Sequence, residues 1–267
     1  MSNRLDGDVA SLTPQLLHDL QAFTAHQRIL VALDFDGTLS PLVDHPQDAR
    51  PLPRSAQLVA LLGTLPGVST AVVSGRNLAS LAEVYPAPLP EIQIGSHGAE
   101  RVLPAALHNI WQEAPLSSEQ SALLATLTER LAKVADGFEN VSLELKPTAT
   151  VLHVRRAAPE DQEPALQQAQ LALQDLHGVK TMLGKAVLEA SVLHTDKGKA
   201  LTWLREELDV QAVLFVGDDV TDENGFRVMQ PQDVSVKVGH GPTAAIHRID
   251  SPFAVPDLLQ NLVSMRT

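Results

Sequence analysis

Three short apolar runs in the chain each end at a cluster of polar residues. The runs are Ile29–Leu33, Ala71–Val73 and Ala212–Val216, and polar side chains do not alternate within them. Strands of this kind are buried on both faces, as in parallel sheets with helices on each side. The intervening segments with the length and apolar spacing of crossover helices are Pro53–Leu62, Leu78–Glu83 and Lys197–Leu208. The pattern therefore predicts an α/β fold with a doubly wound parallel sheet.

The middle of the chain has a different pattern, in which two helices alternate with two hairpins. The expected order is a helix at Glu119–Ala135, alternating strands at Val141–Lys146 and Thr150–Arg155, a helix at Pro164–Leu176, and strands at Val179–Leu183 and Ala186–Ala190. We interpret this αββαββ module as a cap domain inserted into the core. The predicted division is 1–101 for the first part of the core, 102–190 for the cap and 191–267 for the second part, with junctions near Arg101 and Ser191. A further helix is expected at Pro14–Ala25.

Composition narrows the classes of partner. A formal net charge of -12 and a pI near 5.2 disfavour nucleic acids and anionic membrane surfaces. The chain has no cysteine, so the nucleophile is expected among carboxylates and hydroxyls. Residues 1–27 lack the pattern of a secretion signal, and the apolar runs are far shorter than the ~20 residues of a membrane helix. We expect a cytoplasmic protein that acts on a small molecule, with a monomer as the favoured state.

Two aspartates follow the first predicted strand, in the segment Asp34-Phe-Asp-Gly-Thr-Leu39. A turn at Gly37 would keep Asp34 and Asp36 close together, because side chains at i and i+2 of an extended segment point the same way. Asp34 can then attack phosphorus to form an aspartyl-phosphate, and Asp36 can move the proton as general acid and base. The simpler alternative, a pair of solvated turn aspartates, is disfavoured by the strand before them and the Gly-Thr after them.

Two further clusters offer groups that bind phosphate. Ser74 and Gly75 can present a hydroxyl and a backbone N–H where the second predicted strand meets a helix. Arg76 completes this Ser-Gly-Arg motif and belongs to the predicted phosphate-binding set. Lys197 begins a predicted helix, where its ammonium opposes the helix dipole, so we expect it to compensate the charge of the nucleophile and the phosphoryl group. Lys199 is expected at the surface. The alternatives are an ordinary helix cap for the Ser-Gly pair and solvation for both lysines.

The last cluster holds several carboxylates after a buried strand, in the segment Gly217-Asp-Asp-Val-Thr-Asp-Glu-Asn-Gly-Phe226. Together with the first aspartates they suit Mg²⁺, a hard cation that prefers oxygen ligands. Asp218 is expected to bind the metal directly, Asp222 directly or through water, and Asp219 to orient its neighbours. The predicted metal set is Asp34, Asp36, Asp218 and Asp222. An acidic helix start would explain one of these carboxylates but not the cluster.

In this chain order the four clusters resemble the motifs of the haloacid dehalogenase superfamily of aspartyl phosphatases, and the last has the form found in the trehalose-6-phosphate phosphatases. Further matches are Gly95-Ser-His-Gly-Ala-Glu100, Leu143-Glu-Leu-Lys146, and Glu189 after Gly184-Lys185. The resemblance implies a haloacid-dehalogenase-like core, Mg²⁺ as cofactor and a sugar phosphate as substrate. The chain departs from the family after Glu189, where Ala190-Ser191-Val192 stands instead of a residue followed by proline.

The resemblance also implies which residues bind the sugar. Glu144, Lys146 and Glu189 would bind the hydroxyls of trehalose, with His97 and Arg155 nearby. Carboxylates and a lysine on stiff strands can pair with several hydroxyls and leave analogues unsatisfied. Without the resemblance, Glu144 and Lys146 would be interpreted as a surface pair on the outer face of a hairpin.

The expected function is hydrolysis of trehalose 6-phosphate to trehalose and phosphate through an aspartyl-phosphate, as the last step of trehalose biosynthesis. One alternative keeps the chemistry with another sugar phosphate, such as sucrose 6-phosphate or mannosylglycerate phosphate, because the core motifs do not separate these substrates. The other is a non-catalytic module that binds a sugar phosphate. The presence of both Asp34 and Asp36 disfavours it.

Overall fold

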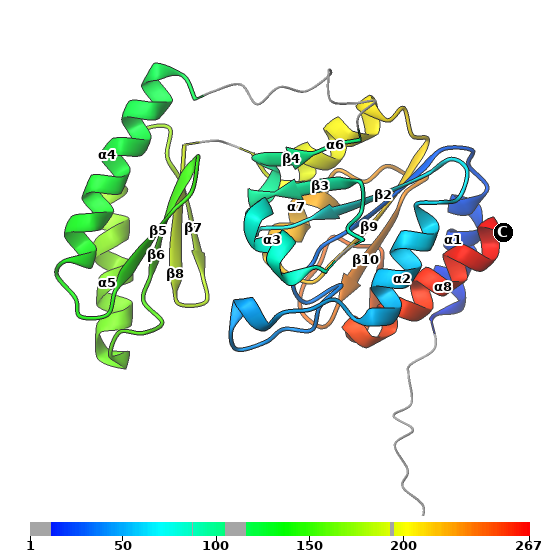
Figure 1. The fold of residues 1–267 in the computed structure, drawn as a ribbon, viewed down its shortest axis with the longest axis horizontal. Helices are drawn as coiled ribbons and strands as arrows, with labels where there is room; N and C mark the ends of the chain where they lie inside the picture. Colours follow the sequence, from blue (N-terminus) through cyan, green and yellow to red (C-terminus); the bar gives the residue numbers. More distant parts are fainter. Residues whose placement is uncertain (1–11, 87, 105–115, 193–194) are drawn as a thin grey trace, which may run out of the picture. The chain divides into compact units, whose positions relative to one another are not determined.

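The computed structural model of the chain describes residues 12–86, 88–104, 116–192 and 195–267 (Figure 1). The chain divides into two units, which we call the core (Met1–Gln112 with Thr195–Thr267) and the cap (Glu113–His194). Both divisions fall later than the junctions predicted near Arg101 and Ser191. Strand β4 (Glu100–Val102), which spans the first predicted junction, pairs with its neighbour in the sheet of the core.

The core is built on a seven-stranded sheet with the order β11-β10-β9-β1-β2-β3-β4. The strands besides β4 are β1 (Ile29–Leu33), β2 (Val68–Val73), β3 (Ile92–Gly95), β9 (Ala212–Gly217), β10 (Val234–Val238) and β11 (His247–Ile249). All neighbours are parallel except β3 and β4. Because β1 pairs with β2 on one side and β9 on the other, the connections leave β1 in both directions. The carboxyl edge of these three strands is a topological switch point, where open α/β sheets bind ligands.

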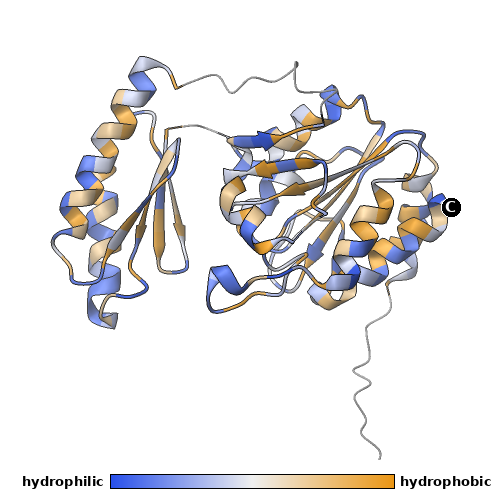
Figure 2. Ribbon diagram, viewed as in Figure 1, coloured by the Kyte–Doolittle hydropathy of each residue, from blue (hydrophilic) through white to orange (hydrophobic). Residues whose placement is uncertain are grey.

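Both faces of this sheet are covered, as the apolar runs predict. In β1, the side chains of Ile29, Val31 and Leu33 enter one hydrophobic cluster, and those of Leu30 and Ala32 enter another. The first cluster includes residues of α1 (Pro14–Thr24), α2 (Pro53–Leu62), α3 (Leu78–Val84) and α8 (Val255–Arg266), and the second includes residues of α6 (Lys197–Glu207) and α7 (Glu223–Phe226). Figure 2 shows apolar strands between helices that are apolar on one side only. The doubly wound sheet is confirmed.

The cap is a four-stranded antiparallel sheet with two helices on one face. The order β5-β6-β8-β7 joins β5 (Ser142–Leu145), β6 (Ala149–His153), β7 (Lys180–Gly184) and β8 (Val187–Ser191), and the helices are α4 (Ser118–Ala135) and α5 (Pro159–Leu173). The αββαββ order is confirmed. The first hairpin was predicted to alternate between buried and exposed side chains, but β6 does not alternate. Four of its five residues are buried, because β6 is a central strand between β5 and β8. Its Thr150 is buried and shares a hydrogen bond of 2.6 Å with Thr128 of α4.

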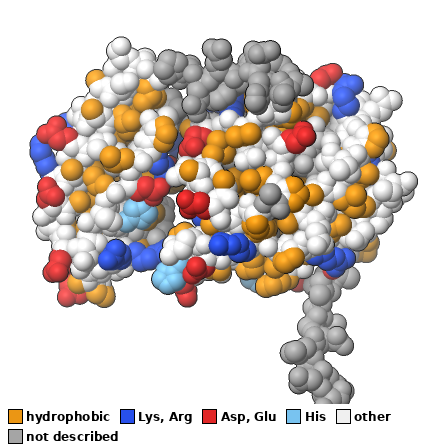
Figure 3. All heavy atoms as spheres, in the orientation of Figure 1, with side chains coloured by type: hydrophobic (Ala, Val, Ile, Leu, Met, Phe, Trp, Pro, Cys, Tyr) orange, Lys and Arg blue, Asp and Glu red, His pale blue; other side chains and the backbone are white. Residues whose placement is uncertain are grey.

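Among the described residues, no helix has the length and apolar character needed to cross a bilayer. On the face of the molecule in Figure 3, basic side chains lie scattered among acidic ones and do not form one basic patch.

Candidate active site

Asp34 follows β1 directly, at the carboxyl edge of the sheet. Its backbone N–H donates to the carbonyl of Val216 at 2.9 Å, and its side chain is buried. Gly37 turns the following loop with a φ of +79°, and a Cβ at this position would lie 2.0 Å from Oδ2 of Asp218. Only glycine therefore lets this loop approach the loop after β9 so closely.

The ammonium of Lys197 joins two carboxylates. Its Nζ donates to Oδ1 of Asp34 at 2.7 Å and to Oδ1 of Asp222 at 2.6 Å, and the side chain is 2% exposed. Lys197 is the first residue of α6, whose N-cap Asp196 accepts a hydrogen bond from the N–H of Lys199. Burial alone would lower the pKa of Lys197, but the charges of Asp222 and Asp34 raise that pKa above its usual value. Lys197 is therefore a fixed cation between two acids.

Three carboxylates gather around this lysine. Asp34, Asp218 and Asp222 each offer an oxygen, and these oxygens lie within 4.8 Å of one another. Burial raises the pKa of Asp34 well above its usual value, and the carboxylates of Asp222 and Asp218 raise it further. The pKa of Asp218 is raised to about 7, first by burial and then by the charge of Asp222. Because one ammonium does not balance three carboxylates, the cluster favours a further positive charge.

The donor set of this cluster fits a divalent cation, because hard cations prefer carboxylate oxygens. Oδ1 of Asp218 is buried and has no hydrogen-bond partner among the described residues. Both oxygens of Asp222 are engaged: Oδ2 accepts the backbone N–H groups of Asp218 at 3.0 Å and Asp219 at 2.9 Å, and Oδ1 binds Lys197. The cluster can therefore hold a divalent cation, with Asp218 offering an oxygen that no hydrogen bond occupies and Asp222 orienting the loop.

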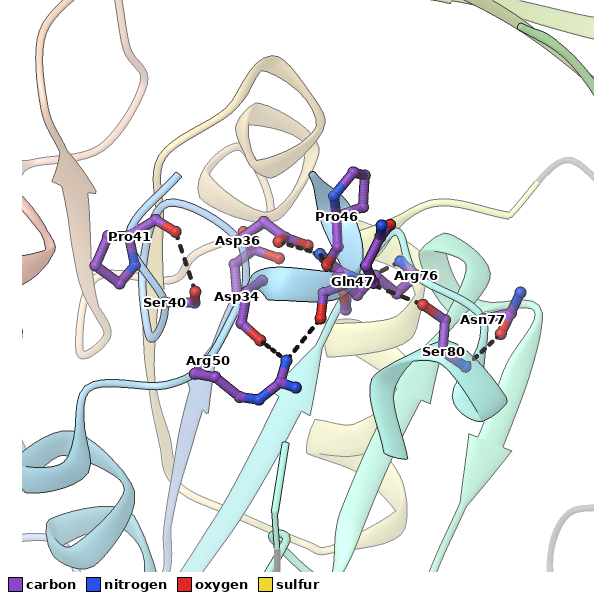
Figure 4. A network of polar contacts seen from close by, with 12 residues as sticks. Asp34, Asp36, Ser40, Pro41, Pro46, Gln47, Arg50, Arg76, Asn77 and Ser80 are labelled. Atoms are coloured by element: carbon purple, nitrogen blue, oxygen red, sulfur yellow. Dashed lines mark hydrogen bonds and ion pairs between the residues drawn. The ribbon is translucent and has the colours of Figure 1, made fainter. Parts of the chain in front are cut away.

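The carboxylate of Asp36 lies outside this cluster, because it is paired with an arginine. It accepts two hydrogen bonds from Arg76, one from Nε at 2.6 Å and one from Nη2 at 2.7 Å. Figure 4 shows this pair, with Pro46 also in contact with Arg76. The structure thus brings Asp36, the predicted acid and base, to Arg76, which the sequence motif suggested as a phosphate ligand.

Ser74 and Gly75 form a corner directly after β2. The backbone N–H of Ser74 donates to the carbonyl of Ile94 in β3 at 2.8 Å, and its hydroxyl accepts the N–H of Arg76 at 3.1 Å. A Cβ on Gly75 would lie 2.5 Å from Cε1 of His97, so the imidazole lies directly against this glycine. The structure therefore places two predicted phosphate-binding residues and a predicted substrate-binding residue side by side.

His97 lies in a strained turn, η2 (Ser96–Gly98), which follows β3. The φ angles of Ser96, His97 and Gly98 are 47°, 56° and 111°, and left-handed backbone is rare for residues other than glycine. Glu100 braces the turn, because it accepts hydrogen bonds from the hydroxyl of Ser96 and from the N–H of Leu78. Such strain costs about 1–3 kcal/mol per residue and persists mainly at functional sites, which supports a role for His97 in binding.

On the cap, the predicted sugar-binding residues share one face of the sheet. Glu144, Val151 and Glu189 lie opposite one another on β5, β6 and β8. Nζ of Lys146 binds Oε2 of Glu189 at 2.7 Å, and Nε2 of His153 shares a hydrogen bond of 2.9 Å with Oε2 of Glu144. The hydrogen bond with His153 lowers the pKa of Glu144. This face is a polar cluster of acids paired with bases.

Arg155 lies just beyond β6, in an exposed turn that follows this polar face. On the core, Lys199 is exposed, as predicted, and so is Asp219. All predicted site residues are among the described residues. Some belong to the core and the others to the cap.

Sequence reasoning missed two residues that support the site. His153 pairs with Glu144, and the signal for it is strand alternation, which places a third ionisable residue on the face of Glu144. Lys237 is 5% exposed, donates to the backbone carbonyl of Asp218 and lies 3.9 Å from Oε1 of Glu223. A lysine inside a buried strand, in the sequence of β10, is the available signal.

The comparisons with known proteins agree with this arrangement. The sequence profile of the trehalose-phosphatase family matches residues 32–256. The chain is 33% identical over 253 residues to a trehalose-phosphate phosphatase of Mycobacterium marinum, and this alignment covers 89% of the chain and 62% of that protein. It is 31% identical over 265 residues to an uncharacterized glycosyl hydrolase of Mycobacterium tuberculosis, which covers 93% of the chain and 19% of that protein. The chain therefore spans less than two thirds of either relative.

The fold is similar to that of the C-terminal domain of trehalose-6-phosphate phosphatase from C. albicans. The TM-score is 0.72 at 22% sequence identity, and the match covers 96% of this chain and 99% of that one. At this identity the likeness supports the architecture, a sheet core with an inserted cap, rather than the chemistry.

Proposed function

This chain belongs to the trehalose-phosphatase family, and from that premise we propose that it hydrolyses trehalose 6-phosphate to trehalose and inorganic phosphate. The observation that carries the proposal is the buried carboxylate of Asp34, held at 2.7 Å by Lys197 beside Asp218 and Asp222. A fixed cation next to a carboxylate stabilises the charge that develops when that carboxylate attacks a phosphate ester. The name of the mycobacterial phosphatase supports the choice of substrate.

The first step is attack by Asp34 on phosphorus. One oxygen of Asp34 is bound to Lys197, and the other forms the bond to phosphorus while the bond from phosphorus to the sugar oxygen breaks. Asp36 gives a proton to the departing sugar oxygen, which leaves as the hydroxyl of trehalose. Lys197 keeps its proton, because its role is to balance charge on Asp34 and on the phosphoryl oxygens.

The second step is hydrolysis of the aspartyl-phosphate. Asp36, now ionised, takes a proton from water as the water oxygen attacks phosphorus. The bond between phosphorus and the oxygen of Asp34 breaks, which releases inorganic phosphate and restores the carboxylate. Asp36 ends the cycle with the proton that it needs for the next turnover, so atoms and charge balance.

We propose Mg²⁺ as the cation of the carboxylate cluster. Asp34 and Asp218 are the direct side-chain ligands in this proposal, and Asp222 orients them through its contacts with Lys197 and the backbone. Asp36 also belongs to the metal set predicted from the sequence, but its carboxylate is paired with Arg76, so we do not propose it as a direct side-chain ligand. When bound, the metal would neutralise charge on the carboxylates and the phosphoryl oxygens.

The phosphate and the sugar are assigned to different residues. Ser74, Gly75 and Lys197 are proposed to bind the phosphoryl oxygens. The imidazole of His97 packs against Gly75 and supports the backbone of this corner. The proposed sugar ligands are His97, Arg155, Glu144, Lys146 and Glu189. The ion pair of Lys146 and Glu189 is largely buried, with side-chain exposures of 9% and 16%, so the two groups are held in place before they meet a hydroxyl.

Phosphate release from a panel of sugar phosphates tests this function. With Mg²⁺, turnover should be faster on trehalose 6-phosphate than on sucrose 6-phosphate or glucose 6-phosphate, and EDTA should abolish it, because three clustered carboxylates need a counter-cation. Equal rates across the panel would contradict the substrate. Tight binding without phosphate release would contradict the reaction and favour a binding module.

A further inference from the structure

Arg76 holds Asp36 in a geometry that only a guanidinium provides. Two parallel hydrogen bonds, of 2.6 Å from Nε and 2.7 Å from Nη2, bind the two oxygens of the same carboxylate. The arginine side chain is 10% exposed, whereas that of Asp36 is 35% exposed. The planar fork fixes both the position and the plane of the carboxylate, which a lysine cannot do.

Two of the three remaining N–H groups of the guanidinium are also engaged. Nη2 donates to the carbonyl of Pro46 at 2.8 Å, and Nη1 donates to the hydroxyl of Ser80 at 3.3 Å. Figure 4 shows these contacts together: Asp36 at the end of the sheet, Pro46 in the following segment and Ser80 on α3 all meet Arg76. The guanidinium also lies 5.4 Å from the ring centre of Phe35, which sits between the two aspartates in sequence.

The backbone of Arg76 is fixed as well. Its N–H donates to the hydroxyl of Ser74 at 3.1 Å, and its carbonyl accepts the N–H of Ser96 at 2.7 Å. A side chain fixed at both ends would have to break several hydrogen bonds to reach a phosphate. Each oxygen of Asp36, by contrast, keeps a second lone pair for proton transfer, because a carboxylate accepts about four hydrogen bonds in all.

We propose that Arg76 is a positioning residue for Asp36: it holds the carboxylate that transfers the proton, and it does not bind the phosphoryl group. This inference rests on the proposed function, because it assigns Arg76 a part in the same reaction. It replaces the role that the Ser-Gly-Arg motif suggests, namely that Arg76 joins Ser74 and Gly75 as a phosphate ligand. The two roles predict different kinetics.

The test compares Arg76→Lys, Asp36→Asn and the double variant with the wild type. Arg54→Lys is the matched control, since Arg54 forms a surface ion pair with Asp257 at 3.0 Å. The measured quantities are kcat on trehalose 6-phosphate, kcat on 4-nitrophenyl phosphate, and the inhibition constant of inorganic phosphate. The nitrophenolate ion leaves without a proton, so its release does not need Asp36 as an acid.

Arg76→Lys should lower kcat on trehalose 6-phosphate by roughly 10- to 100-fold, which is part of the usual contribution of acid–base catalysis. The loss of kcat on 4-nitrophenyl phosphate should be smaller. The inhibition constant of phosphate should stay within about twofold, because no phosphate contact is lost. In the Asp36→Asn background the same substitution should cost little more, since it acts through Asp36. Arg54→Lys should match the wild type.

The inference is overturned if Arg76→Lys raises the inhibition constant of phosphate about tenfold or more and if its loss of kcat adds to that of Asp36→Asn in the double variant. This result would show that Arg76 is a phosphate ligand. Wild-type kinetics in Arg76→Lys would overturn it too. If Arg76→Lys does not fold, Arg76→Gln carries the same comparison. Should the wild type reject trehalose 6-phosphate, the proposed substrate fails, and the comparison on glucose 6-phosphate and 4-nitrophenyl phosphate still decides the role of Arg76.

Discussion

Lys197 lies between two buried carboxylates, and at the scale of single residues it sets the charge of the site. Replacing it with methionine keeps most of the volume but leaves Asp34 and Asp222 without their cation. Breaking a buried pair in this way costs about 3–5 kcal/mol of stability, and we expect kcat to fall by at least ~100-fold. Thermal unfolding and phosphate release measure the two effects. Lys199→Met, at an exposed position of the same helix, is the control, and equal behaviour of the two variants would contradict the role of Lys197.

Asp218 is partly buried and adds a third carboxylate beside Asp34 and Asp222. Its pKa is raised to about 7 by burial and by Asp222. Without metal, Asp218→Asn should therefore raise the Tm by about 2–4 °C, which corresponds to about 1 kcal/mol in a domain of this size. Mg²⁺ should raise the Tm of the wild type but not that of the variant, because the variant loses a metal ligand. Asp219→Asn, at an exposed neighbour, should keep the response. A full Mg²⁺ response in Asp218→Asn would contradict the assignment.

Tyr85 is buried against Phe35, and its hydroxyl has no hydrogen-bond partner among the described residues. Tyr85→Phe should therefore be neutral or stabilising, by up to about 1 kcal/mol. Burial raises the pKa of Tyr85 from 10.0 to about 12, so folding opposes ionisation, and stability present below pH 10 should be lost between about pH 10 and pH 12. Urea unfolding at pH 8 and pH 11 checks this. A smaller alkaline loss in Tyr85→Phe is expected, and an unchanged loss would contradict it.

At the scale of elements, the polar face of the cap sheet depends on contacts between neighbouring strands. His153 on β6 binds Glu144 on β5, so His153→Gln should raise the KM for trehalose 6-phosphate by roughly 10-fold, as expected for a hydrogen bond to a charged group. Turnover of 4-nitrophenyl phosphate, which has no sugar, should not change. His177→Gln, at an exposed loop position of the cap, is the control. Equal losses on both substrates would contradict a role in sugar binding.

The elements with the clearest local signals were predicted well. Residues 29–33 and 53–62 have the predicted bounds, because β1 is an unbroken apolar run and α2 begins at a proline. Strands β3, β4, β10 and β11 were not predicted. Three of them have only three or four residues, and Lys237 interrupts the apolar pattern of β10. Strand pairing is set by packing across the whole sheet, which a local pattern does not record.

The candidate site was predicted unevenly for the same reason. Residue types at strand ends pointed to Asp34, Asp218 and Asp222, and the start of a helix pointed to Lys197. These residues do meet. The pairing of Asp36 with Arg76 was not predicted. A motif identifies a side chain, but it does not show which residue 40 positions away that side chain contacts in the fold. The left-handed turn at His97 was also missed, since no glycine marks that position.

At the scale of the whole molecule, the cap interrupts the core in sequence but not in its sheet. β1 comes before the cap and pairs directly with β9, which comes after it. This pairing brings Asp34 from one part of the core to Lys197, Asp218 and Asp222 from the other. The chemistry therefore depends on the two parts completing one sheet, while the cap keeps a separate hydrophobic core of its own.

Trapping of the aspartyl-phosphate tests the central claim most directly. The wild type is mixed with trehalose 6-phosphate and Mg²⁺, quenched during turnover and treated with borohydride, which reduces an acyl phosphate on aspartate to homoserine. Peptide mass spectrometry then locates the change. We predict homoserine at position 34 and nowhere else, and none without substrate. Homoserine at another aspartate, or active turnover with no reduced residue, would contradict attack by Asp34.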